Sequence, residues 1–197
     1  MKILLLAALL ALTNAVSEID MLDAYYLTKT SSCDYYDVQA WKCPSCSYPT
    51  IKDSVQTKVI TDFTTGGQVV VNYNPTAKRI QIAFRGSKNI ANWLANLSYG
   101  QVAFYPSVCL DCKVHAGFLD SYNAVSAAIT DQVKLLQKQW GAANPLFITG
   151  HSLGGALASI AAVDLAIKFP NTKISLFTFG SPRTANRQFF NFFTLKT

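Results

Sequence analysis

The sequence predicts a single α/β domain built around a largely parallel sheet. In the second half of the chain, short apolar runs alternate with stretches of helical spacing, and this alternation is typical of parallel strands connected by helices. Half of the 197 residues are hydrophobic, so a globular domain of this length can bury a sizeable core. No internal repeat and no low-complexity linker interrupts the sequence.

The first segment of the chain predicts a secretory signal peptide. Lys2 is followed by an unbroken apolar run and then by small residues around Ala15, which is the order found in such peptides. The apolar run is too short to cross a bilayer, and no later stretch is long enough. We expect residues 1–15 to be removed during secretion, which leaves one domain over residues 16–197. The alternative is a buried N-terminal helix.

The remaining chain is expected to open with one helix and three strands. The run EIDMLDAYYLTKTSSC has helical spacing, with Met21, Tyr25 and Leu27 on one side. Three alternating runs, separated by Gly-Gly and Asn-Pro turns, predict strands: TKVITDFT, GQVVVNY and KRIQIAFRGS. In the third run the apolar residues alternate, so they share one face of the strand.

The second half of the chain is expected to begin with a long helix over DSYNAVSAAITDQVKLLQKQW. Its apolar stripe consists of Val125, Ile129, Val133, Leu136 and Trp140. Strands and helices then alternate: PLFIT is a short buried strand, residues 153–168 are an alanine-rich helix, KISLFTFG is a strand and NRQFFNFF starts a helix. This order favours a parallel arrangement of the strands.

The pentapeptide GHSLG separates the predicted strand PLFIT from the helix at residues 153–168. A serine at a tight strand-to-helix turn is the nucleophile-elbow motif. A side chain at Gly150 or Gly154 would collide with neighbouring backbone in such a turn. The helix N-terminus would then face the anion that develops during attack on an ester. We therefore predict that Ser152 is a nucleophile and that the Leu153 N–H is the first oxyanion donor.

A second oxyanion donor must come from another loop. The predicted strand IAF ends at an Arg-Gly-Ser sequence, in which Ser87 could offer both its N–H and its hydroxyl. From this segment alone, the alternative is a glycine-containing turn with a solvated serine. The position of the segment at the end of an apolar strand makes it the candidate loop.

Four segments resemble, in order and spacing, the secreted fungal-type (class 3) lipases: FRGSKNIANWLANL, VHAGFLDSYNAV, ITGHSLGGALASIAAVDL and FTFGSPRTANRQF. These lipases are α/β-hydrolases, with helices on both faces of the sheet, that act on triacylglycerols and related esters. The resemblance implies that Ser152 is the nucleophile and that Ser87 and Leu153 form the oxyanion hole. We expect a monomer that acts on lipid or ester substrates at a lipid–water interface, without cofactor, metal or nucleic acid.

The segment after Ser87 would hold the lid in this family. Ile90, Trp93, Leu94 and Leu97 fall on one helical face. An apolar helix of this kind could cover the site in water and lie on a lipid surface when open. The alternative is a helix packed permanently against the core.

Five cysteines indicate either disulfides or a metal site. The CPSC and CLDC sequences could together supply four thiolates to zinc, but secretion favours disulfides. The family resemblance implies two local pairs, Cys43–Cys46 and Cys109–Cys112. Cys33 resembles the family position that pairs with a cysteine near the C-terminus, and this sequence has no cysteine there.

The base that Ser152 needs is not evident in the sequence. In this fold the acid and the histidine follow the serine, but no histidine follows Ser152. The only later acid, Asp164, is twelve positions along the helix, or about 18 Å away at a rise of about 1.5 Å per residue. His151 should point away from the serine hydroxyl, and His115 is expected to support the oxyanion region. We therefore expect a fold that is incomplete at its C-terminus and a chain that is inactive by itself.

The charge and the motifs leave three classes of function to compare. The net charge is +6, but the basic residues are scattered, which indicates a solvated surface or a mild preference for anionic lipid. The favoured function is a secreted carboxylic ester hydrolase, most simply a triacylglycerol lipase. The alternatives are a non-catalytic member of the same fold that binds lipid surfaces, and a disulfide- or zinc-stabilised secreted binding module.

Overall fold

The computed structural model describes residues 17–62, 66–86 and 100–196. Its elements are α1 (Glu18–Thr30), α2 (Tyr35–Gln39), the 3₁₀ helix η1 (Pro44–Ser47), β1 (Val55–Asp62), β2 (Gly67–Asn74), β3 (Arg79–Phe84), β4 (Gln101–Ala103), β5 (Lys113–His115), α4 (Ala116–Trp140), β6 (Leu146–His151), α5 (Leu153–Lys168), β7 (Ile174–Phe179) and α6 (Arg187–Lys196). The predicted signal peptide at residues 1–15 lies outside the described residues. Within them, no helix is both long enough and apolar enough to cross a membrane.

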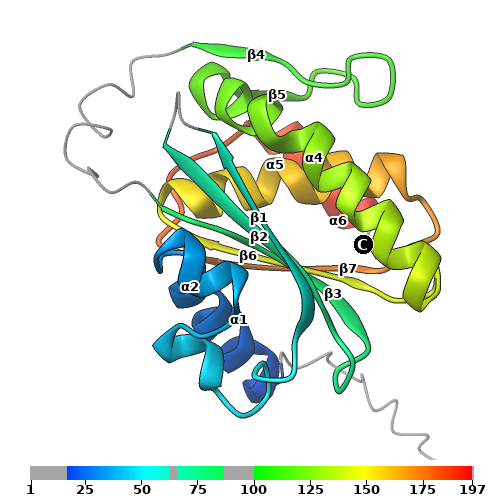
Figure 1. Cartoon of the computed structure of the whole chain (residues 1–197). Coiled ribbons are helices and arrows are strands. Elements are labelled where there is room, and N and C mark those ends of the chain that lie inside the picture. Colours follow the sequence, from blue (N-terminus) through cyan, green and yellow to red (C-terminus); the bar gives the residue numbers. More distant parts are fainter. Residues whose placement is uncertain (1–16, 63–65, 87–99, 197) are drawn as a thin grey trace, which may run out of the picture.

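The central sheet has the strand order β1-β2-β3-β6-β7 (Figure 1). β1, β2 and β3 pair antiparallel, whereas β3, β6 and β7 pair parallel. Only four residues separate β1 from β2 and β2 from β3, and connections this short can join only antiparallel neighbours. The crossovers through α4 and α5 produce the parallel pairs. The predicted α/β class is confirmed. Among the described strands, the sheet is mixed rather than largely parallel, because the first three strands form hairpins.

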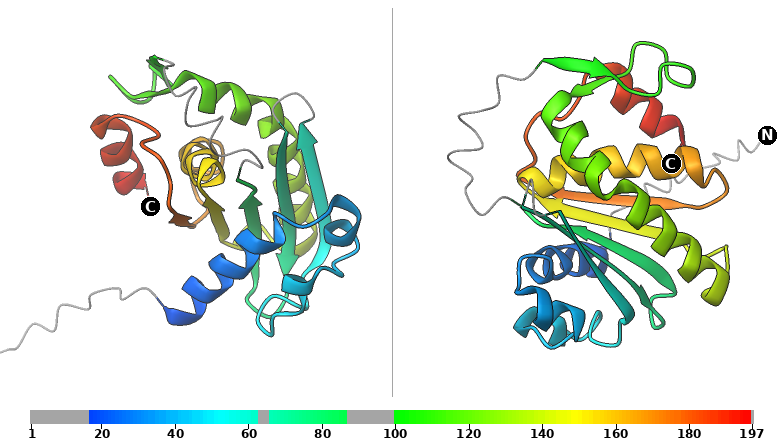
Figure 2. Two further views of the ribbon diagram at one scale, coloured as in Figure 1. Left: turned by 90° about the vertical axis from the view of Figure 1, so that its left-hand side faces the viewer. Right: turned by 45° about the horizontal axis from the view of Figure 1, so that its top comes forward.

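Helices cover both faces of this sheet (Figure 2). α4 and α5 pack on one face, with α6 beside α5, while α1 and α2 pack on the other. Ile80, Ile82 and Phe84 of β3 are fully buried in the core beneath α4 and α5. The intervening Ala83 belongs to the smaller core under α1. The alternation predicted for this strand is therefore confirmed, and it places apolar residues in both layers.

The long helix α4 begins four residues before the predicted start. The predicted apolar stripe is buried at four positions, Val125, Ile129, Val133 and Leu136. Trp140, the fifth, is 38% exposed. Its ring stacks on Tyr73 at a centroid distance of 4.4 Å, and its indole N–H donates a hydrogen bond to Gln56. Trp140 therefore covers the end of the sheet from outside rather than filling the core.

The prediction that Met21, Tyr25 and Leu27 lie on one side of α1 was wrong. Leu27 is buried, but Met21 and Tyr25 are 47% and 45% exposed. At about 100° per residue, Leu27 lies some 240° around the helix from Met21, so these side chains cannot share a face. The buried face instead includes Asp23, whose carboxylate accepts a hydrogen bond from Arg79 of β3 at 2.5 Å. A buried ion pair thus replaces part of the expected apolar contact.

Several short elements were not predicted from the sequence. α2 and η1 follow α1, and β4 pairs with β5 in a separate two-stranded sheet. Disulfides link Cys43 to Cys46 and Cys109 to Cys112, while Cys33 remains a free thiol. These pairings agree with the family resemblance. They also occupy the thiols that a zinc site would need, and the described residues contain no group of three His, Cys, Asp or Glu side chains that could hold a metal ion.

Candidate active site

Ser152 lies at the junction between the end of β6 and the start of α5. Its φ of 54° and ψ of −125° are unusual for a residue with a side chain, and such strain is characteristic of functional positions. The Ser152 N–H donates a hydrogen bond to the carbonyl of Phe179 in β7 at 2.9 Å. The neighbouring parallel strand therefore holds the strained turn in place.

The glycines around Ser152 are required by close backbone contacts. A Cβ added at Gly150 would overlap the carbonyl group of Gly154, and one added at Gly154 would overlap the carbonyl oxygen of Phe84. Both clashes were predicted from the sequence. Gly155 was not singled out, yet its added Cβ would lie 2.9 Å from the Cβ of Ser181. These three glycines let α5 start directly against β3, β6 and the loop after β7.

The first turn of α5 supplies hydrogen-bond donors next to Ser152. Leu153 is buried and Ser152 is half-buried. The first N–H groups of a helix have no acceptor within the helix, and the positive end of the helix dipole favours an anion there. The chemistry available at this turn is therefore a serine hydroxyl beside donors that can accommodate a negative oxygen.

The loop after β3 runs against the elbow. A Cβ added at Gly86 would lie 2.9 Å from the carbonyl oxygen of His151 and 3.7 Å from the Cβ of Ser152. Contact this close explains a glycine at that position. The next residue, Ser87, and the predicted lid positions lie outside the described residues: Ile90, Trp93, Leu94 and Leu97.

The two histidines of the sequence, His115 and His151, contact other parts of the structure than the Ser152 hydroxyl. The exposed His151 side chain lines a pocket of about 290 Å³ together with Tyr25 and Phe179, on the α1 side of the sheet. His115 is buried and caps α4, because its Nδ1 accepts a hydrogen bond from the N–H of Phe118 at 3.4 Å. Successive residues of a strand point to opposite faces, which fits the orientation of His151 away from the next residue.

Asp164 is a structural anchor rather than a partner of Ser152. It is 3% exposed and accepts hydrogen bonds from the hydroxyls of Tyr105 and Tyr122, each at 2.5 Å. The Lys168 ammonium donates to the same carboxylate at 2.7 Å. Burial, and then the Asp164 charge, raises the pKa of Tyr122 well above its ordinary value. These contacts tie the β4–β5 region and α4 to α5.

The sequence and the structure are similar to known lipases. The family model described as "Lipase (class 3)" matches residues 81–197. Secreted mono- and diacylglycerol lipase 1 of Fusarium solani is 39% identical over 137 residues, which cover 68% of this chain and 38% of the relative. The chain thus spans about two fifths of the length of the curated relatives it matches.

Two solved structures have the same fold. Lipase II from Rhizopus niveus superposes with a TM-score of 0.81 at 25% identity, covering 90% of this chain and 67% of that one. A triacylglycerol lipase whose catalytic centre is described as a serine protease triad superposes with a TM-score of 0.79 at 31% identity. The superposition covers 92% of this chain and 69% of the lipase.

Proposed function

Because the chain belongs to the class 3 lipase family, we propose that it forms the nucleophile-bearing part of a secreted lipid esterase. The observation that carries the proposal is the conformation of Ser152, a non-glycine residue with φ of 54° between a parallel strand and a helix N-terminus. Gly150 and Gly154 make the turn possible. This arrangement presents a hydroxyl for nucleophilic attack.

The proposed reaction is acyl transfer through Ser152. Its Oγ attacks the carbonyl carbon of an ester while a base removes the hydroxyl proton. The carbonyl oxygen becomes an oxyanion, which the N–H groups of Leu153 and Ser87 would stabilise. The C–O bond to the alcohol then breaks, and the base returns the proton to the leaving alcohol. Water hydrolyses the acyl-serine in the same way and regenerates Ser152.

The base and the acid of this reaction are not among the described residues near Ser152. His115 caps α4, His151 faces the α1 side, and Asp164 is held by two tyrosines and a lysine. The family resemblance implies that both groups follow the segment TANRQFFNFF. We therefore propose that residues supplied by that later part of the family fold complete the site.

Acylglycerols at a lipid–water interface are the proposed substrates. The Fusarium solani relative is named a mono- and diacylglycerol lipase, and one structural relative is a triacylglycerol lipase. A lid that includes Ile90, Trp93, Leu94 and Leu97 would supply the apolar surface that contacts lipid. No cofactor is needed, because serine, base and oxyanion donors are sufficient for acyl transfer.

We propose that the protein is secreted. The Fusarium solani relative is named as secreted, and disulfides such as Cys43–Cys46 form in oxidising compartments. Residues 1–15 would be the signal peptide, and residues 16–197 the lipase-type domain portion, which we propose acts as a monomer.

The esterase activity of residues 16–197 alone is expected to be very low. A serine hydroxyl without a base is too weakly acidic to attack an ester at neutral pH. Oxyanion donors alone leave at most about 10³- to 10⁴-fold acceleration over water. Release of p-nitrophenol from p-nitrophenyl butyrate measures this. Full, Ser152-dependent turnover would instead show that His115 or His151 acts as the base.

A hybrid protein tests the proposed function itself. In the hybrid, residues 16–197 are joined to the part of the Fusarium solani lipase that follows its matched region. We expect turnover of the same ester, and Ser152→Ala should lower kcat by about 10⁴-fold or more. Ser126→Ala on α4 is the control, and circular dichroism establishes that each variant is folded. A folded hybrid that is equally active with Ser152→Ala would refute the proposal.

A further inference from the structure

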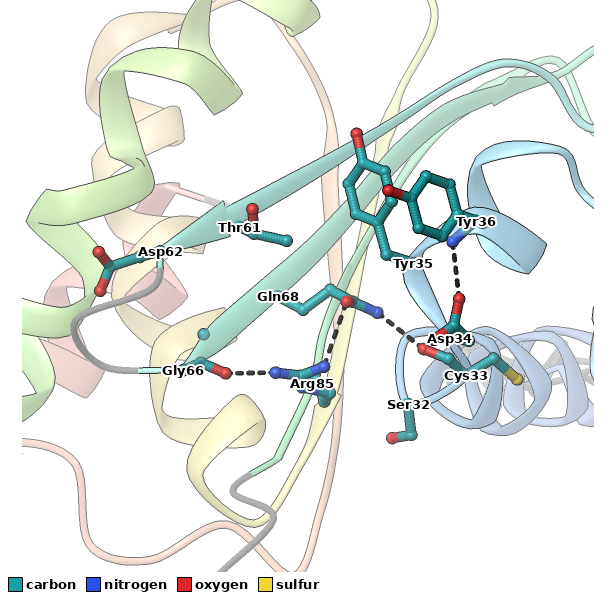
Figure 3. Close-up of a pocket in the computed structure, with 11 residues that line it drawn as sticks. Ser32, Cys33, Asp34, Tyr35, Tyr36, Thr61, Asp62, Gly66, Gln68 and Arg85 are labelled. Carbon is teal, nitrogen blue, oxygen red and sulfur yellow. Dashed lines mark hydrogen bonds between the residues drawn. The ribbon is translucent and has the colours of Figure 1, made fainter.

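A polar groove of about 840 Å³ lies at the end of β1, between the β1–β2 hairpin and the loop after α1 (Figure 3). Its floor contains the end of β1, the start of β2 and Arg85, which directly follows β3. β3 runs parallel to β6, so Arg85 and Ser152 follow the same ends of their strands. Gly86 then reaches the elbow, as its close approach to the Cβ of Ser152 shows. One lining residue of the groove, Arg85, is therefore separated from the elbow by Gly86 alone.

The guanidinium of Arg85 is held in a fixed orientation in the groove. Its Nη1 donates to the Oε1 of Gln68 at 3.1 Å, and its Nη2 donates to the carbonyl of Gly66. Gln68 is 3% exposed, and its Nε2 donates to the carbonyls of Ser31 at 2.9 Å and Cys33 at 3.1 Å. Segments from three parts of the chain thus orient one cation in advance of ligand binding.

Arg85 retains donors for a ligand. A guanidinium has five N–H groups, and the hydrogen bonds of Arg85 to Gln68 and Gly66 use two of the four on Nη1 and Nη2. Burial lowers the pKa of Arg85, but arginine remains charged at neutral pH. A planar fork of charged donors suits the oxygens of a phosphate group.

The opposite wall of the groove is aromatic and acidic. The rings of Tyr35 and Tyr36 meet edge to face, with centroids 5.2 Å apart, and Tyr36 is 79% exposed. Asp34 lies beside these tyrosines and accepts a hydrogen bond from the Tyr36 N–H at 3.0 Å, whereas Asp62 lines the groove at the end of β1, away from them (Figure 3). Aromatic faces attract quaternary ammonium groups, and nearby carboxylates add to that attraction. Because a carboxylate and two aromatic rings lie together on this wall, a simple anion is not the ligand that the described lining fits best.

We propose that this groove binds the zwitterionic phosphocholine head group of a glycerophospholipid. The phosphate contacts Arg85, and the trimethylammonium group lies against Tyr35 and Tyr36, near Asp34. The volume of about 840 Å³ is within the roughly 300–1,000 Å³ typical of small-ligand sites. Only one consequence rests on the proposed function: a lipid held by this head group would present its esters beside Ser152, so glycerophospholipids join acylglycerols as substrates.

Calorimetric titration of the full chain with soluble phosphocholine tests the proposal. Inorganic phosphate and tetramethylammonium, which represent the two halves of the head group, are titrated in parallel. We expect phosphocholine to bind at least tenfold more tightly than either half. Tyr36→Leu should raise its Kd by about 3- to 30-fold, because the substitution removes an aromatic face but keeps an apolar side chain.

Tyr25→Leu provides the matched control. Tyr25 is a tyrosine with 45% exposure on α1, and it does not line this groove. The control should leave the Kd of phosphocholine unchanged. The proposal is overturned if phosphocholine does not bind at millimolar concentration, if phosphate binds equally tightly, or if the two tyrosine variants behave alike. Phosphocholine contains no acyl ester, so this result is independent of whether the hybrid hydrolyses esters.

Discussion

Replacement of Gly154 by alanine is expected to destabilise the fold by about 4 kcal/mol or more, which is exceptional for a single methyl group. The added Cβ would overlap the carbonyl oxygen of Phe84 and lie 2.9 Å from the carbonyl carbon and oxygen of Arg85. These atoms belong to the backbone at the end of a central strand, so no side chain can rotate away. Relief requires α5 to move off the sheet, which would also displace Ser152.

Urea denaturation followed by circular dichroism measures this loss of stability. Gly100→Ala is the matched control, because no heavy atom of the described residues lies within 4 Å of the position its Cβ would take. The control should change the free energy of unfolding by less than about 0.5 kcal/mol. If the two variants unfold at the same urea concentration, the close packing of the elbow against β3 is incorrect.

Replacement of Asp164 by alanine is expected to lower the free energy of unfolding by about 3 kcal/mol. The substitution leaves the buried hydroxyl of Tyr122 and the hydroxyl of Tyr105 without their acceptor. It also removes the partner of the Lys168 ammonium. Thermal or urea unfolding checks this value. Asp131→Ala, at an exposed acid on α4, is the control and should be nearly neutral.

Alkaline titration gives a second readout of the Asp164 variant. The pKa of Tyr122 is raised by burial and then by Asp164, so in the folded state the phenol keeps its proton above pH 10. The protonated Tyr122 phenol therefore stabilises the folded state, and this stabilisation is complete below a pH of about 10, the pKa of tyrosine in the unfolded chain. It is lost as the pH rises, because the unfolded chain ionises first. In Asp164→Ala the tyrosinate absorbance of the folded protein should appear at lower pH, and an unchanged titration would contradict the assignment.

The sequence was sufficient to predict the second half of the fold. The helix at residues 153–168 matches the bounds of α5, and PLFIT and KISLFTFG overlap β6 and β7. These segments have clear apolar runs and one glycine-rich turn between them. The nucleophile elbow was predictable for the same reason, because the clash at Gly150 is with Gly154, four positions later in the same turn. The partner of the clash at Gly154 is Phe84 of β3, and the sequence did not identify it.

Features that depend on distant residues were not predictable. Asp23 is buried in α1 only because Arg79, 56 positions later, pairs with it. Hydrophobic periodicity contains no signal for such an ion pair. The hydrogen bonds around Asp164 were unpredictable for the same reason, because Tyr105 lies 59 positions away from Asp164 in the sequence.

The polar groove, a candidate binding site, could not be predicted from the sequence for the same reason. Arg85, Gln68 and the loop after α1 are connected by hydrogen bonds between segments up to 37 positions apart. Each segment by itself resembles an ordinary strand end or turn. Only the pairing of β2 with β3 and the packing of α1 against the sheet bring them together.

Covalent labelling of the hybrid protein tests most directly whether Ser152 is the nucleophile. A p-nitrophenyl alkylphosphonate transfers its phosphonyl group to an activated serine and releases p-nitrophenol. Mass spectrometry of the peptides should then show one phosphonyl group, located on Ser152, with loss of esterase activity in proportion. No label should appear in the Ser152→Ala variant. A phosphonyl group on another residue of the inactivated hybrid, with Ser152 unmodified, would contradict the assignment.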